Sequence, residues 1–314
     1  MPKPMQPLVE RELSEKFTVH QPFKSEDPEG MIASVKDDIV GIAAGGVDVD
    51  DAYLDQFPNL KIIANFGVGY DSIDANACEK RGVIVTNTPD VLTEDVADIA
   101  MALLLSTTRE LSAAERWLRA GNWEAKGSFP LTRGSLRGRI MGIVGLGRIG
   151  KAIAHRAEAF GLTICYHGRS KQDGVAYPYY PSVMALAEAC DTLMLVAPGG
   201  EETKHMVGES VFEALGPEGI VINIGRGTVI DEAALIKALQ DGTILGAGLD
   251  VFEEEPHVPE ALRKLENTVL LPHVGSASQF TRNAMAQLVV DNLVGWFEKG
   301  HPVTPVAETP FPAK

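Results

Sequence analysis

The sequence of 314 residues predicts an α/β protein with doubly wound parallel sheets. Three observations support this fold class. Apolar runs typical of buried strands alternate with helix-like runs along most of the chain. A glycine-rich turn separates a strand-like run from a helix-like run within residues 140–160, and one long helix-like segment, residues 93–120, divides the chain into two α/β halves. Alternation of strand and helix is typical of parallel sheets with crossover helices.

The first half contains short apolar runs, each ended by glycine or proline. Runs of this kind indicate buried strands, because a parallel strand covered on both faces loses its polar alternation. The predicted strands are residues 18–23, 39–44, 61–66 and 83–87, and the predicted helices are residues 8–17, 48–57 and 73–80.

The segment 93–120 contains neither glycine nor proline, so it predicts one long helix. Glu94 and Asp95 favour its first turn, where acidic side chains complement the helix dipole. Residues 99–105 are apolar on every face, and such a helix must be buried in a large core or against a partner. A single small domain cannot cover all faces, so we expect a symmetric homodimer.

The second half repeats the alternation with longer elements. Its predicted strands are residues 140–144, 162–166, 191–198, 219–224, 245–251 and 268–271, and its predicted helices are residues 151–160, 183–189, 231–240 and 279–299. Neither half contains a solenoid-like repeat.

The glycine-rich turn predicts a dinucleotide site. Gly145, Gly147 and Gly150 match G-x-G-x-x-G between an apolar strand and a helix, the context in which this motif is informative. The first glycine permits the tight turn, the second lets a pyrophosphate approach the backbone, and the third lets the helix pack on the strand. The N–H groups at the helix N-terminus then face the anion. The half is therefore Rossmann-like.

The loop after the next strand indicates which dinucleotide binds. An NAD site usually has an acid about 20 residues after the glycines, which holds the ribose 2′-hydroxyl. Here that position has Arg169, Ser170 and Lys171, and no acid precedes Asp173. A cationic loop with a hydroxyl group suits a 2′-phosphate, which favours NADP(H). The alternative is an ordinary solvated basic loop.

Composition excludes several classes of function. The formal net charge of −15 argues against a nucleic-acid surface, which is normally basic. The start of the chain has no signal-peptide apolar region, and no apolar run approaches the ~20 residues that span a bilayer. Cys78, Cys165 and Cys190 show no paired or metal-ligand spacing, so we expect reduced buried thiols, no metal and a cytoplasmic protein.

Three polar residues follow consecutive strands of the second half. Arg226 follows the fourth strand between two glycines, Glu255 follows the fifth, and His273 follows the sixth. Each alone is ordinarily a surface cation, a solvated acid or a structural histidine. Together they lie where ligands collect in open α/β sheets, at the carboxyl ends of the strands, so they predict a catalytic group.

The chain resembles the D-isomer-specific 2-hydroxyacid dehydrogenase family over nearly its whole length. Within that family it is most similar to the NADPH-preferring glyoxylate/hydroxypyruvate reductases and the plant hydroxyphenylpyruvate reductases. The motifs that carry the resemblance are Gly67-Val68-Gly69-Tyr70-Asp71, Asn87-Thr88-Pro89-Asp90-Val91-Leu92-Thr93, Gly145-Leu146-Gly147-Arg148-Ile149-Gly150, Gly168-Arg169-Ser170, Ile222-Asn223-Ile224-Gly225-Arg226-Gly227, Gly248-Leu249-Asp250-Val251-Phe252, Glu255-Pro256 and Pro272-His273-Val274-Gly275.

The resemblance implies roles for these residues in reducing small 2-oxo acids such as glyoxylate, hydroxypyruvate and phenylpyruvates. Arg226 would bind the substrate carboxylate, which suits its fork geometry, together with the amides of Val68 and Gly69. His273 would protonate the carbonyl oxygen, oriented and kept charged by Glu255. The implied cofactor contacts are Gly145, Gly147, Arg148, Ile149, Gly150, Arg169, Ser170, Lys171, Val196, Pro198, Thr203, Ile224, Gly225, Asp250 and Gly275.

The resemblance also implies the domain order and the rival functions. A substrate domain, residues 1–97, would be completed by residues 286–314, with a cofactor domain and dimerisation arm, residues 98–285, inserted between them. The alternative enzyme is an NAD-linked D-lactate or phosphoglycerate dehydrogenase, against which the missing acid argues. A dinucleotide-sensing corepressor is the alternative of another class.

Overall fold

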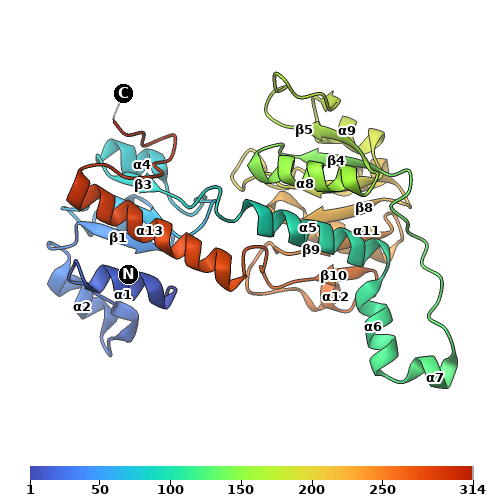
Figure 1. The fold of residues 1–314 in the computed structure, drawn as a ribbon, viewed down its shortest axis with the longest axis horizontal. Coiled ribbons are helices and arrows are strands. Elements are labelled where there is room, and N and C mark those ends of the chain that lie inside the picture. The colour runs from blue at the N-terminus through green and yellow to red at the C-terminus, as the bar shows by residue number, and fades with distance from the viewer. Residues whose placement is uncertain (313–314) are drawn as a thin grey trace. The chain divides into compact units, whose positions relative to one another are not determined.

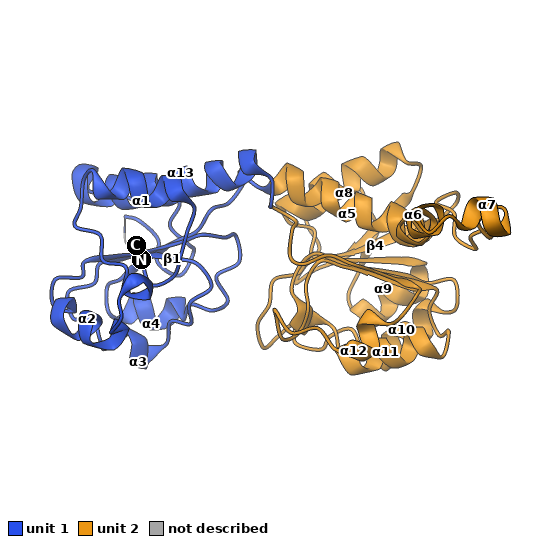
Figure 2. Cartoon of the chain, turned by 90° about the horizontal axis from the view of Figure 1, so that it is seen from below, with its two compact units in different colours: residues 1–92, 277–314 blue, residues 93–276 orange. Residues whose placement is uncertain are grey.

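The computed structural model describes residues 1–312 and divides into two compact units (Figures 1 and 2). Unit 1 combines residues 1–92 with the C-terminal segment from Ala277, and unit 2 is the intervening Thr93–Ser276. The predicted boundaries at 97/98 and 285/286 differ because each falls inside a helix. Helix α5 (Thr93–Thr108) belongs whole to unit 2, and helix α13 (Gln279–Lys299) belongs whole to unit 1.

Unit 1 is built on a parallel sheet with the strand order β1-β2-β3. Helices α1 and α13 lie on one face of this sheet, and α2, α3 and α4 lie towards the other (Figure 2). The elements besides α13 are α1 (Pro7–Ser14), η1 (Pro22–Lys24), α2 (Pro28–Val35), β1 (Gly41–Ala44), α3 (Asp51–Leu54), β2 (Ile62–Asn65), α4 (Ala75–Lys80) and β3 (Ile84–Thr86).

Local signals explain most of these elements. Ser278 caps α13 by accepting from the Thr281 N–H, and Gly300 ends that helix in the left-handed conformation. The helix predicted at 48–57 shortens to α3, because Val49 forms a β-bridge with Ile73 and Asp50 caps the helix that follows. The strand predicted at 18–23 is wrong: its proline starts the short 3₁₀ helix η1 instead.

Unit 2 contains a parallel sheet in the order β10-β9-β8-β7-β4-β5-β6. The chain reverses direction across the sheet at β4, which lies between β5 and β7, and this doubly wound order was predicted. The elements besides α5 are α6 (Leu111–Arg119), α7 (Asn122–Lys126), β4 (Ile140–Val144), α8 (Arg148–Ala159), β5 (Thr163–His167), β6 (Tyr179–Tyr180), α9 (Val183–Ala189), β7 (Thr192–Leu195), α10 (Glu209–Leu215), β8 (Ile220–Asn223), η2 (Gly227–Val229), α11 (Glu232–Gln240), β9 (Gly246–Leu249), α12 (Glu260–Arg263) and β10 (Thr268–Leu270).

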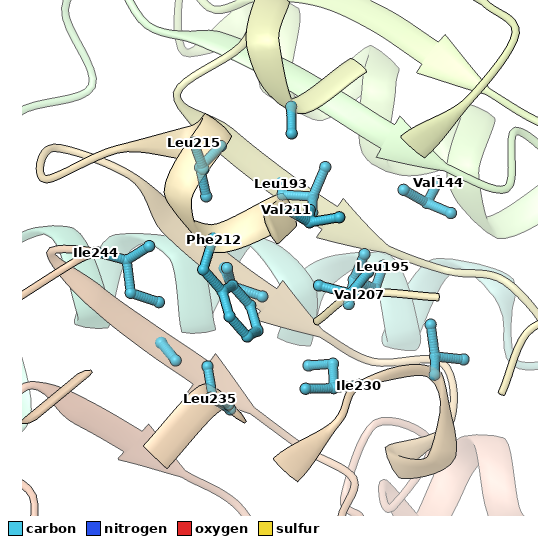
Figure 3. Packing of buried hydrophobic residues seen from close by; sticks show 14 of the residues in the cluster. Val144, Leu193, Leu195, Val207, Val211, Phe212, Leu215, Ile230, Leu235 and Ile244 are labelled. Carbon is cyan, nitrogen blue, oxygen red and sulfur yellow. The ribbon is translucent and has the colours of Figure 1, made fainter. Parts of the chain in front are cut away.

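Helices cover both faces of this sheet. Helices α5 and α8 lie on one face, and α9, α10, α11 and α12 lie on the other (Figure 2). Figure 3 shows part of the core under the second group, where the fully buried Phe212 of α10 packs among Leu235, Ile244 and strand residues such as Leu193. Burial of this apolar surface holds the strand ends, and the loops that follow them, in place.

The segment 93–120 forms two helices rather than the single long helix predicted. The chain turns at Glu110, which adopts a left-handed conformation with φ of 51°. A close tertiary approach accompanies the break: a Cβ on Gly134 would lie 2.5 Å from the Thr108 carbonyl oxygen, so the returning loop passes directly against the end of α5. Within the single chain, most of residues 99–105 are buried or partly buried and Ala102 is exposed, so burial of this stretch against a partner stays a prediction.

Candidate active site

The glycine-rich turn lies at the point where the sheet of unit 2 reverses its strand order. Gly145 follows β4 with φ of 96°, and a Cβ there would lie 2.9 Å from the Ala197 backbone nitrogen beyond β7. Gly147 is the N-cap of α8, and no side chain caps this helix. A Cβ on Gly147 would meet no heavy atom within 4 Å. The turn therefore offers an open backbone surface and first-turn amides to an anion.

The predicted cationic loop follows β5, the neighbour of β4 on the other side of the switch point. Arg169, Ser170 and Lys171 are all exposed. None of the three forms an ion pair or side-chain hydrogen bond with another of the described residues 1–312. Two cations and a hydroxyl group are thus available to a ligand on the same sheet edge as the glycine turn.

His273 and Glu255 form a hydrogen-bonded pair beyond β10 and β9. The Nδ1 atom of His273 lies 2.7 Å from Oε2 of Glu255, while Oε1 of Glu255 accepts from the Phe252 N–H at 3.0 Å. His273 has φ of 53°, a conformation that few non-glycine residues adopt and that recurs at functional sites. Among residues 1–312, Nε2 of His273 has no hydrogen-bond partner, whereas Nδ1 is held by Glu255.

Electrostatics favours a charged Glu255. Burial by itself raises the pKa of a carboxyl group, but the hydrogen bonds from His273 and the Phe252 N–H outweigh it, and the positive charges of His273 and Arg226 add to their effect. The net result is a Glu255 pKa below its ordinary value. Glu255 is therefore a carboxylate at neutral pH.

Asp250 holds the loop that carries His273 through hydrogen bonds to its backbone. Its buried carboxylate accepts from the N–H groups of Val274 and Gly275, both at 2.7 Å, and its carbonyl oxygen accepts from the His273 N–H at 2.9 Å. Burial raises the pKa of Asp250, although these two amide bonds and the nearby His273 charge oppose the rise. Asp250 thus connects the end of β9 to the histidine loop after β10.

Arg226 lies in the loop after β8, close enough to Glu255 to contribute to its lowered pKa. The buried Asn223 shapes this loop: its side chain accepts from the Gly225 N–H at 3.0 Å and donates to the Arg226 carbonyl oxygen at 2.9 Å. Gly227 is required next, since a Cβ there would lie 1.8 Å from the Phe252 carbonyl carbon. The sheet edge thereby brings together the three residues predicted to be catalytic.

The remaining residues predicted to contact a cofactor lie on the same edge of the sheet. Thr203 donates to the Pro198 carbonyl oxygen at 2.8 Å, which closes the loop after β7. A Cβ on Gly225 would lie 2.6 Å from the Ala197 carbonyl oxygen, so the loops after β7 and β8 touch. The other positions are Arg148 and Ile149 at the start of α8, Gly150 buried behind the turn, Val196 after β7, Ile224 after β8 and Gly275 after β10.

Val68 and Gly69 lie in unit 1, in the loop after β2. Three carbonyl groups of this loop accept hydrogen bonds: Gly67 from the Thr88 N–H, Val68 from Asn87 Nδ2 at 2.8 Å, and Gly69 from Asn65 Nδ2 at 2.9 Å. Within residues 1–312, the N–H groups of Val68 and Gly69 donate to no other group. With its carbonyls engaged and these amides free, the loop is suited to bind an anion.

Sequence reasoning missed the asparagines that shape two of these loops. Asn65, Asn87 and Asn223 each end or follow a strand and use the side-chain amide to fix a neighbouring turn. For Asn65 and Asn223 the available signal was an asparagine at a strand end shortly before a glycine. It is a weak signal, because asparagine is common in ordinary turns.

The cysteines offer little reactivity. Burial raises the pKa of Cys78 and of Cys165 to about 11 and that of Cys190 to about 12, so all three remain thiols at neutral pH. Cys190 is only partly buried, unlike the other two. Among residues 1–312, no group of three or more His, Cys, Asp or Glu side chains is arranged to hold a metal ion, and no helix is long and apolar enough to cross a membrane.

A doubly wound sheet with a glycine turn, a histidine–carboxylate pair and an arginine on one edge defines the class of nicotinamide-dependent oxidoreductases. Residues 101–275 match the NAD-binding domain of the D-isomer specific 2-hydroxyacid dehydrogenases. The chain belongs to this family, which confirms the resemblance seen in its motifs.

Named relatives cover nearly the whole chain. A glyoxylate/hydroxypyruvate reductase A of Arabidopsis thaliana is 48% identical over 306 residues, 96% of this chain and of the relative. A hydroxyphenylpyruvate reductase of Plectranthus scutellarioides is 45% identical over the same shares. A solved NADPH-dependent glyoxylate/hydroxypyruvate reductase of Sinorhizobium meliloti, in complex with NADP and malonate, has a TM-score of 0.93 and 52% identity, covering 100% of this chain and 97% of its own.

Proposed function

We propose that this protein is an NADPH-dependent reductase that converts small 2-oxo acids, such as glyoxylate and hydroxypyruvate, to D-2-hydroxy acids, with phenylpyruvates as further candidate substrates. The observation that carries the proposal is the His273–Glu255 pair beside Arg226, on the sheet edge that also bears the glycine turn. The names of the relatives point to the same chemistry.

The protein's own groups suit each part of the reaction. Arg226 would bind the substrate carboxylate and present the keto group to His273, and the amides of Val68 and Gly69 are the further donors that we propose for that carboxylate. NADPH, when bound, supplies a hydride to the carbonyl carbon. His273 would donate the proton from Nε2 to the carbonyl oxygen, and Glu255 would stabilise the imidazolium before transfer. The 2-oxo acid gains a hydride, which carries two electrons and one hydrogen, and one further proton from His273, and solvent restores the proton to His273.

The cofactor preference rests on the loop after β5. Arg169 and Lys171 supply positive charge and Ser170 a hydroxyl group, whereas the acid that would hold an NAD ribose is missing. A reductase complexed with NADP is among the similar solved structures. Arg148, Ile149 and the three glycines of the turn would hold the pyrophosphate, and Asp250 would accept from the nicotinamide carboxamide.

A panel of 2-oxo acids with both cofactors tests this function. We expect the highest kcat/KM with glyoxylate or hydroxypyruvate and NADPH, and D-glycerate as the product from hydroxypyruvate. Preference for NADH would instead support the NAD-linked alternative. Tight NADPH binding with no turnover of any 2-oxo acid would support the dinucleotide sensor.

Replacing the proposed acid tests the mechanism. His273→Asn keeps a polar side chain but cannot deliver a proton, so kcat should fall by roughly 10²–10⁴. His155→Asn, on α8, is the control and should leave turnover unchanged. Near-normal kcat in His273→Asn would exclude this histidine as the acid.

We further propose a homodimer formed through the segment around α6 and α7. Large apolar side chains are exposed there: Leu111, Leu118, Trp123 and Leu131 have exposed fractions of 49%, 56%, 62% and 99%. Exposure of such a group is typical of an interaction surface. Sedimentation at micromolar concentration should show a dimer, and an active monomer would refute this assembly.

A cytoplasmic location completes the proposal. The chain has three free cysteines and no disulfide pairing among its described residues, which suits a reducing compartment. Fractionation of the source cells, with the enzyme followed by its NADPH-dependent activity, tests this assignment.

A further inference from the structure

The cationic loop after β5 is held at both of its ends. At the start, the Tyr179 hydroxyl group of β6 donates to the Gly168 carbonyl oxygen at 3.3 Å. At the end, the Gln172 N–H donates to the Tyr166 hydroxyl oxygen at 2.8 Å. Tyr166 is fully buried in β5, so this second anchor belongs to the rigid core of unit 2.

The side chain of Gln172 makes a different connection. Its Nε2 atom donates to the Leu146 carbonyl oxygen at 2.8 Å. Leu146 is the buried residue between Gly145 and Gly147, inside the glycine-rich turn. A single residue therefore bonds through its backbone to the support of the cationic loop and through its side chain to the turn that faces the pyrophosphate.

We propose that Gln172 is a positioning residue for cofactor choice. It sets the distance between the cationic loop and the glycine turn, so that one dinucleotide can bind its 2′-phosphate at the loop and its pyrophosphate at the turn. This inference rests on the proposed NADPH dependence. Gln172 is not among the residues proposed to contact either phosphate. It would act by positioning Arg169, Ser170 and Lys171.

Coupling of the two loops matters only for a ligand that fills both. NADPH carries both anionic groups, so any displacement of one loop from the other weakens its binding. NADH lacks the 2′-phosphate and depends on the turn alone. Loss of the Gln172 bond should therefore lower the selectivity for NADPH rather than binding of dinucleotides in general.

The test is Gln172→Met, which keeps the length of the side chain but removes the donor. The ratio of kcat/KM for NADPH to that for NADH should fall about three- to tenfold, mainly through the KM for NADPH, since one uncharged hydrogen bond is lost. Gln172→Asn keeps the amide but is too short to reach Leu146, so it should show a similar fall. Gln240→Met, at an exposed position of α11, is the control and should retain the wild-type ratio.

Nucleotide fragments separate positioning from general loosening of the loop. As competitive inhibitors, 2′,5′-ADP fills both anion sites and 2′-AMP fills only the cationic loop. The Ki of 2′,5′-ADP should rise more in Gln172→Met than the Ki of 2′-AMP. Equal rises for the two fragments would overturn the coupling, as would a wild-type cofactor ratio in both Gln172 variants.

Failure of this inference is distinguishable from failure of the proposed cofactor. If Arg169→Ala lowers the NADPH preference while the Gln172 variants do not, the loop reads the phosphate without help from Gln172. If the wild-type protein prefers NADH, the cofactor proposal itself is wrong. Thermal unfolding of each variant shows whether a change in KM comes from a damaged fold.

Discussion

The two loops of unit 2 that we propose to bind the anionic groups of the cofactor are built on opposite principles. The glycine turn after β4 consists of backbone, with Gly145 in a left-handed conformation and in close approach to Ala197. The loop after β5 consists of exposed side chains, Arg169, Ser170 and Lys171. A site made of backbone amides would bind the pyrophosphate of either dinucleotide, whereas a site made of side chains can choose between dinucleotides. The first loop should therefore control whether a cofactor binds, and the second should control which one.

Gly145→Ala should give the largest effect. The new Cβ meets the Ala197 backbone in a conformation that L residues rarely adopt, so the turn must shift, at a cost of about 1–3 kcal/mol. The Tm should fall by roughly 2–10 °C, and the KM values for NADPH and NADH should rise together. Gly161→Ala is a matched control with a left-handed backbone but no contact, so it should lose stability alone. A change confined to NADPH would contradict the division between the loops.

Gly147→Ala separates binding from folding within the turn. Its Cβ meets no protein atom, so the free energy of unfolding should change by less than about 1 kcal/mol. The corresponding change in Tm is less than roughly 2–4 °C. The methyl group would occupy the surface that the pyrophosphate approaches, so both KM values should rise about 10- to 100-fold. Fluorescence titration with each cofactor measures the corresponding rise in the dissociation constant. Unchanged affinity would mean that the pyrophosphate does not lie against Gly147.

Arg169→Ala should affect one cofactor alone. A hydrogen bond to a charged group contributes about 1.5–3 kcal/mol, which solvent exposure reduces here, so kcat/KM for NADPH should fall roughly 10- to 100-fold. The loss should appear in KM, because the 2′-phosphate is remote from hydride transfer. The kcat/KM for NADH should stay within about twofold of wild type. In the exposed control Arg137→Ala, kcat/KM should stay within the same limit for both cofactors. An equal loss on both cofactors would place Arg169 outside 2′-phosphate recognition.

Salt should produce the smallest effect. The cationic loop is exposed, so raising NaCl from about 0.05 to 0.5 M screens its charges and should lower the NADPH preference a few-fold. The ratio of kcat/KM for NADPH to that for NADH reports on this loop alone, because the glycine turn should bind the pyrophosphate of both cofactors equally. A preference insensitive to salt would indicate that hydrogen-bond geometry, rather than charge, selects the 2′-phosphate.

The amino-acid sequence determined most of the elements, and it predicted that Arg226, Glu255 and His273 lie on one sheet edge. Strands such as 140–144 and helices such as 183–189 were predicted with their observed limits, because apolar periodicity and terminal glycines, prolines and caps act locally. Arg226, Glu255 and His273 were predictable because residues after parallel strands share one sheet edge, whatever the details of packing.

Tertiary structure alone decided where the chain bends and how the loops are supported. Nothing local in residues 93–120 breaks the helix, and the break at Glu110 accompanies the passage of Gly134 against Thr108. The bonds of Asn87 and Gln172 likewise connect a side chain to the carbonyl group of a loop distant in sequence, over 19 and 26 residues. Periodicity reports which face of an element is buried, but a hydrogen bond between two loops depends on where folding places both of them.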